Sequence, residues 1–100
     1  MASRELERIR TAILDHRYTL TEHAYDEMEE DNLDVLDVES AILTGKIDQV
    51  LTRDPRGTRY VVIGNPTDQQ TAIGVVLRFV EHDQLLIITV YEIKEGNGHV

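Results

Sequence analysis

Five side chains in two parts of the sequence could transfer protons or bind an anion. His23 can exchange a proton near neutral pH, and Tyr91 can donate or accept a proton or stack its ring on a base. Arg59 and Arg78 are permanently charged and can bind a phosphate through two parallel hydrogen bonds. Thr89 adds a hydroxyl near Tyr91. Structural roles are the alternatives: a packing or capping histidine, surface arginines paired with acids, and a Thr–Tyr packing pair.

Metal and thiol chemistry are not indicated. The sequence contains no cysteine, which excludes disulfides, thiolate metal sites and cysteine nucleophiles. His23, Asp26 and Glu27 share one face of a predicted helix, but such clusters are typical of a solvated helix surface. We therefore predict no metal site and no cofactor.

The charge is strongly acidic and unevenly distributed. The net charge is −9, from 19 acidic and 10 basic residues, which argues against loose electrostatic binding of nucleic acid. Nine acids lie between Glu22 and Glu39 without a single Lys or Arg, whereas four arginines and two acids lie between Arg53 and Arg78. The sequence therefore predicts an acidic helical half beside a sheet with a mildly basic patch.

The length and composition predict one globular domain over residues 1–100. The chain has 100 residues, 41% of them apolar, which is enough for an ordinary core. The longest nearly apolar run, 85–90, is far too short to span a bilayer, and the charged start has no apolar run typical of a signal sequence. We expect a cytoplasmic protein without membrane contact.

Three helices are expected in the first half of the chain. Apolar residues at helical spacing predict helices over 4–15, 22–31 and 35–44, with a short break at 16–20. Ser3, Thr21 and Asp34 are suitable N-caps. Gly45 is expected to end the third helix as its C′ residue.

The second half changes to the period of two that indicates strands. The expected strands are 46–53, 59–64, 72–81 and 84–93, separated by short turns. Four sequential antiparallel strands form a meander, and the helices must cover one of its faces. The predicted fold class is α+β, with helices at about 4–44 and the sheet at about 46–93.

The last hairpin carries three of the five chemical side chains. Its tip is expected at His82 and Asp83, which defines one wholly apolar face and one mixed face. The apolar face is expected to pack on the helices and to contain Ile73, Val75, Leu77, Phe79, Leu86, Ile88 and Val90. The expected pairs on the mixed face are Arg78 with Ile87, Val76 with Thr89 and Gly74 with Tyr91.

Several short motifs together resemble a known family. They are His23-Ala24, Glu27-Met28 and Asp31, then RYVV at 59–62 and ITVY at 88–91. The pattern, over roughly 18–93, resembles an uncharacterised bacterial domain-of-unknown-function family. That family is grouped with RelE-like toxins in the barnase–EndoU–colicin–RelE ribonuclease superfamily. Many of its members carry arginines after the His-Ala pair, where this chain has acids.

The resemblance implies a RelE-like fold and metal-independent RNA cleavage by the toxin of a toxin–antitoxin pair. RNA would be the substrate and a small antitoxin the partner. His23 would be a general acid or base, Arg59 and Arg78 would bind phosphate, and Tyr91 would be a second proton-transfer or stacking group beside Thr89. The alternative is a non-catalytic protein-binding module on the same fold, whose acidic helical half holds a basic partner.

Overall fold

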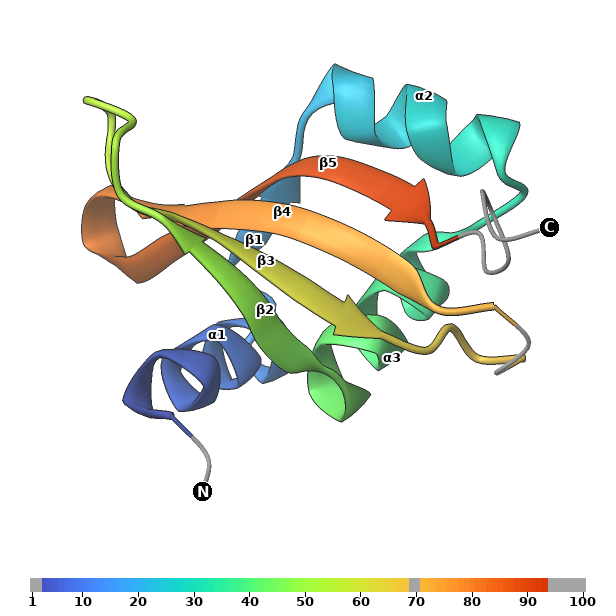
Figure 1. The fold of residues 1–100 in the computed structure, drawn as a ribbon, viewed down its shortest axis with the longest axis horizontal. Coiled ribbons are helices and arrows are strands. Elements are labelled where there is room, and N and C mark those ends of the chain that lie inside the picture. The colour runs from blue at the N-terminus through green and yellow to red at the C-terminus, as the bar shows by residue number, and fades with distance from the viewer. Residues whose placement is uncertain (1–2, 69–70, 94–100) are drawn as a thin grey trace, which may run out of the picture.

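The computed structural model describes residues 3–68 and 71–93. Along the chain, the helices come before most of the strands (Figure 1). No helix in these ranges is long and apolar enough to cross a membrane. In chain order the elements are α1 (Arg4–Leu14), β1 (Tyr18–Leu20), α2 (Glu22–Glu30), α3 (Val35–Thr44), β2 (Lys46–Leu51), β3 (Arg59–Gly64), β4 (Ile73–Val80), a 3-10 turn (Glu81–Asp83) and β5 (Gln84–Glu92).

Each helix begins at the N-cap expected from the sequence. The Ser3 hydroxyl accepts a hydrogen bond from the Leu6 N–H at 3.0 Å, and the Thr21 hydroxyl accepts one from the Ala24 N–H at 3.0 Å. Asp34 forms a reciprocal capping box at the start of α3. These three predictions are confirmed.

The sheet differs from the expected meander by one short strand. Its order is β1-β5-β4-β3-β2, and β2 to β5 pair antiparallel in sequence order. β1 pairs parallel with β5, so the prediction of four antiparallel strands is wrong and the sheet is mixed. Three residues are too few to show a period of two, which is why this segment was expected to be only a break between helices.

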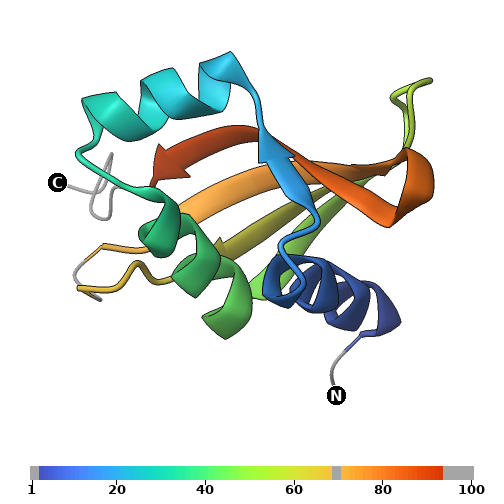
Figure 2. The ribbon, with the colours of Figure 1, turned by 180° about the vertical axis from the view of Figure 1, so that it is seen from behind.

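The layers leave one face of the sheet bare. α1 and α3 pack against one face, and α2 lies beside β5 at the sheet edge (Figures 1 and 2). No helix of the described ranges covers the opposite face, which we call the open face. The core fills the covered side and includes Ile9, Ile13, Ile42, Val62, Ile73, Val75, Leu77, Leu85, Ile87 and Val90.

Two glycines allow α3 to lie directly against β3. Gly45 is extended, with φ −93° and ψ −169°, rather than left-handed as its expected C′ position implied. A Cβ at Gly45 would overlap the carbonyl oxygens of Ile63 and Ala41, and a Cβ at Gly64 would also overlap the Ala41 carbonyl. Close backbone approach therefore explains both glycines.

A bulge in β5 changes the register of the last hairpin. Thr89 pairs with Val76 and Tyr91 with Gly74, as predicted, but the register shifts after Val76. The turn spans Glu81–Asp83, so the predicted two-residue tip at His82 and Asp83 is wrong. Between this turn and the bulge, Arg78 faces Leu86 instead of Ile87, so that part of the prediction is also wrong. Leu85 and Ile87 consequently point into the core in place of Leu86 and Ile88, whose side chains are only partly buried.

Candidate functional site

Four of the five side chains singled out in the sequence lie on the open face. Arg59 of β3 pairs directly with Arg78 of β4. Thr89 and Tyr91 of β5 pair with Val76 and Gly74, which share a face with Arg78 because alternate residues of a strand point the same way. On the open face, residues that pair across neighbouring strands form a row. Arg78, Thr89 and Tyr91 therefore lie in three successive rows. Arg78 and Gly74, four residues apart on β4, are separated by about 13 Å along the strand.

Arg59 shares a carboxylate with its neighbours in the β2–β3 loop. Its Nε lies 3.4 Å from Asp54 Oδ2, and the Asp54 side chain is only 4% exposed. Asp54 also accepts hydrogen bonds from Arg56, from Nε at 3.1 Å and from the backbone N–H at 2.9 Å. The hydrogen bonds from the Arg56 side chain are the main reason that the pKa of Asp54 lies below its usual value. Asp54 therefore stays ionised and holds both arginines.

Arg78 has no comparable carboxylate among the described residues. Within residues 3–68 and 71–93 it forms no ion pair, and its Nε is buried without a hydrogen-bond partner. The Nε of Arg59 is likewise without a hydrogen bond in these ranges. Because guanidinium groups stay protonated, the paired arginines carry two positive charges beside the single carboxylate of Asp54. Such a pair is suited to hold an anion between the strands.

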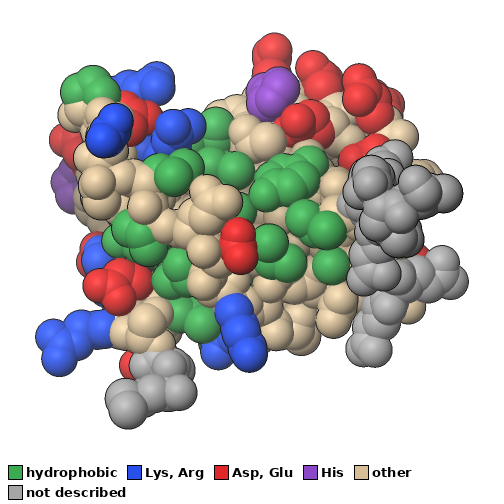
Figure 3. Space-filling model, viewed as in Figure 1, with side chains coloured by type: hydrophobic (Ala, Val, Ile, Leu, Met, Phe, Trp, Pro, Cys, Tyr) green, Lys and Arg blue, Asp and Glu red, His purple; other side chains and the backbone are tan. Residues whose placement is uncertain are grey.

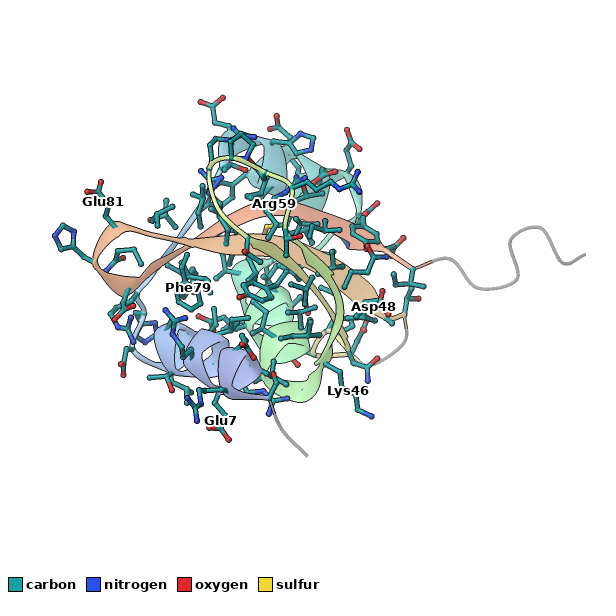
Figure 4. All side chains as sticks on the ribbon, turned by 60° about the vertical axis from the view of Figure 1, so that its left-hand side comes forward. Glu7, Lys46, Asp48, Arg59, Phe79 and Glu81 are labelled. Atoms are coloured by element: carbon teal, nitrogen blue, oxygen red, sulfur yellow. The ribbon has the colours of Figure 1, made fainter. Side chains whose placement is uncertain are left out.

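A cleft beside Arg59 extends this basic region into the loop. It has a volume of about 530 Å³ and is lined by Val50, Leu51, Thr52, Arg53, Asp54, Pro55, Arg56 and Arg59. Basic side chains, coloured blue, gather at this end of the face in Figure 3. Arg59 lies at the opposite end of the β2–β3 pair from Lys46 in Figure 4. Neither Arg53 nor Arg56 was singled out in the sequence as a site residue. The excess of arginines between 53 and 78 was the available signal.

His23 lies apart from the arginines, on α2 at the β5 edge. Its side chain is 65% exposed, and its Nε2 is 3.3 Å from Glu27 Oε2. Glu27 Oε1 in turn accepts a hydrogen bond from the Val90 N–H at 2.9 Å. The structure therefore links His23 through one carboxylate to the backbone between Thr89 and Tyr91. Glu27 was not among the expected site residues, although its spacing of four from His23 could have suggested the pair.

Tyr91 lies flat over Gly74. A Cβ added at Gly74 would overlap the Tyr91 ring and its hydroxyl group, so the ring occupies the space that a side chain at Gly74 would fill. No hydrogen bond ties the hydroxyl within the described part of the chain. The hydroxyl is therefore available to a ligand on the open face. No group of three His, Asp or Glu side chains in the same part of the chain is arranged to hold a metal ion.

The chain is thus a small α+β domain whose bare sheet surface carries arginine and hydroxyl side chains. A family model described as a domain of unknown function, DUF4258, matches residues 20–92. The match covers well over half of the chain, which therefore belongs to this family. The prediction of an uncharacterised domain-of-unknown-function family is confirmed. No curated protein and no solved structure matched the chain.

Proposed function

We propose that the chain is a RelE-like, metal-independent endoribonuclease that acts as the toxin of a toxin–antitoxin pair, with a small antitoxin as its partner. The observation that carries the proposal is the Arg59–Arg78 pair on the open face, with both Nε atoms lacking hydrogen-bond partners in the described residues. The reaction class and the antitoxin partner in this proposal are taken from the resemblance of the motifs to RelE-associated domains.

The row of Thr89 is the natural place for the reacting phosphate. Arg78 lies one row, about 7 Å, to one side of Thr89, and Tyr91 lies one row to the other side. Side chains from both rows can reach a phosphate above Thr89, whose hydroxyl would donate to it. Arg59, on the far side of Arg78, would bind the same or the next phosphate.

In this reaction the 2′-oxygen of the substrate attacks the adjacent phosphorus and the bond to the 5′-oxygen breaks. The products are a 2′,3′-cyclic phosphate and a 5′-hydroxyl. His23 would take the proton from the 2′-hydroxyl, because its Glu27 partner stabilises the imidazolium that forms. Tyr91 would give a proton to the leaving 5′-oxygen, and the arginines would stabilise the charge on the pentacovalent phosphorus.

The first test is a growth assay with inducible expression, followed by analysis of total RNA. Wild type is compared with His23→Ala, Tyr91→Phe and Arg78→Gln. Growth arrest and RNA cleavage by wild type, lost in the variants, are expected. Toxicity that persists in every variant would mean that the toxic activity does not depend on these residues of the open face.

A purified assay separates catalysis from indirect toxicity. A labelled oligoribonucleotide is incubated in EDTA beside the same oligonucleotide with one 2′-deoxy position. Cleavage is expected everywhere except at the deoxy position, because the nucleophile there is missing. Folded wild-type protein that cleaves neither oligonucleotide and arrests no growth would instead support the non-catalytic binding module.

A further inference from the structure

A second surface lies on the helical side of the molecule, between α2 and the start of α3. It is a groove of about 450 Å³ lined by Tyr25, Asp26, Met28, Glu29, Asn32, Leu33, Asp34 and Val35. Met28 is 3% exposed, and Leu33 and Val35 pack against the core, so the floor is apolar. Asp26, Glu29 and Asp34 are exposed and make the rim acidic. The groove shares no lining residue with the arginine cleft.

The rim charges have no basic partners in the part of the chain that the structure describes. Of the ion pairs among residues 3–68 and 71–93, only His23–Glu27 involves the segment from Glu22 to Glu39. Asp34 accepts the Asp37 N–H as an N-cap, but neither the Asp26 nor the Glu29 side chain forms a hydrogen bond or ion pair in the described residues. Acidic side chains gather over α2 in Figure 3. The described residues therefore give the groove a negative potential.

Apolar side chains are also exposed around this groove. Tyr25 on its wall is 51% exposed, and Leu36, the residue after Val35, is 64% exposed. Neither side chain is needed to fill the core, and large apolar groups exposed within a polar rim are typical of interaction surfaces. Tyrosine in particular combines a large apolar area with a polar tip, and it is enriched at such sites.

We propose that the α2–α3 groove binds a basic segment of a partner protein. An apolar side chain of that segment would lie on Met28, Leu33 and Val35, and flanking Arg or Lys residues would pair with Asp26 and Glu29. The acidic rim attracts basic side chains and repels phosphate groups, so a basic peptide segment is the expected occupant. The residues that line the groove are not those of the proposed RNA site, so the two proposals can fail separately.

The test uses the full chain and a fluorescein-labelled arginine-rich peptide that contains leucines, with binding followed by anisotropy. The matched probe has serine in place of each leucine. Binding of the leucine peptide should be at least about 10-fold tighter, since burying one leucine contributes that much. Both affinities should fall as salt is raised. Equal affinities for the two peptides would mean nonspecific attraction and overturn the proposal, and so would the absence of binding.

Two matched double variants locate the site. Asp26→Asn with Glu29→Gln should weaken binding by about 5-fold or more, while Glu5→Gln with Glu7→Gln removes the same charge from exposed positions on α1 and should have little effect. An equal loss in both variants would refute the groove. Amide shifts on peptide addition should cluster in residues 25–35, and shifts confined to the sheet would also refute it.

Tyr25→Ser tests the apolar part of the groove without altering its charge, and about a 10-fold loss of affinity is expected. If wild type instead self-associates and Tyr25→Ser abolishes that association, a second copy of the chain is the occupant and the proposal fails. Arg78→Gln should leave peptide binding unchanged. That control keeps failure of this proposal distinct from failure of the ribonuclease proposal.

Discussion

Thr21 connects α2 to the bulge that sets the faces of β5, and Thr21→Val should test that connection. Its hydroxyl accepts the Ala24 N–H at 3.0 Å as the N-cap of α2 and donates to the Ile88 carbonyl at 2.9 Å. Its own N–H donates to the Ile87 carbonyl at 3.0 Å. Valine has nearly the same shape and keeps the backbone bond, so the substitution removes only the two hydroxyl interactions.

The expected cost is about 2 kcal/mol. Loss of an N-cap threonine costs about 1 kcal/mol, and leaving the partly buried Ile88 carbonyl without its donor costs about 1 kcal/mol more. With an m-value of about 1–1.5 kcal/mol/M, the urea midpoint should fall by roughly 1.5 M. The melting temperature should fall by roughly 10 °C.

Urea unfolding followed by circular dichroism measures this cost, with Thr19→Val as the matched control. Thr19 lies on β1, is exposed and forms no side-chain hydrogen bond in the described residues, so its substitution should change stability by less than about 0.5 kcal/mol. Equal midpoints for the two variants would refute the role given to the Thr21 hydroxyl. An unchanged m-value would show that the folded state keeps its compactness.

Three further changes probe the open face and the titrating groups. Gly74→Ala should cost about 1–3 kcal/mol in urea unfolding by displacing the Tyr91 ring, and the cost should largely vanish in a Tyr91→Ala background. The pKa of Asp54 is lowered, chiefly by Arg56, so the ionised carboxylate stabilises the folded state above the usual pKa of 3.8. This stability is lost as the pH falls through the folded-state pKa. In Asp54→Asn the free energy of unfolding should therefore depend less on pH in that range. Burial and a neighbouring carboxylate raise the pKa of Tyr18 from 10.0 to about 12, so wild type should lose stability as pH rises across that interval, and Tyr18→Phe should not.

Local chemistry made the helices predictable. Ser3, Thr21 and Asp34 cap within one turn of their own helices, so residue type and spacing suffice. β1 could not be found in this way, because Tyr18–Leu20 becomes a strand only by pairing with β5, more than sixty residues later. The sequence around 16–20 carries no signal of that partner.

The pairing at the candidate site was predictable only in part. The turn spans Glu81–Asp83 and not two residues, so Arg78, between the turn and the bulge, faces Leu86. The extra residue of β5 at the bulge offsets this difference, and Thr89 and Tyr91 pair as expected. At the bulge, the Ile87 and Ile88 carbonyls accept hydrogen bonds from Thr21, the N-cap of α2, and a hairpin considered alone does not include these contacts. For the same reason the sequence did not identify Asp54 as the partner of Arg59 or place Glu27 between His23 and β5.

The position of α2 connects the two proposed surfaces. One side of the helix holds β5 through Thr21 and Glu27, and another side carries Asp26 and Glu29 on the groove. A peptide seated in the groove therefore contacts the helix that also positions His23. If the surfaces are separate, Arg78→Gln should impair only RNA cleavage and the Asp26→Asn, Glu29→Gln double variant should impair only peptide binding. If bound peptide changes the cleavage rate of wild type but not of Glu27→Leu, which cannot accept the Val90 N–H, the Glu27 side chain is the physical route between them.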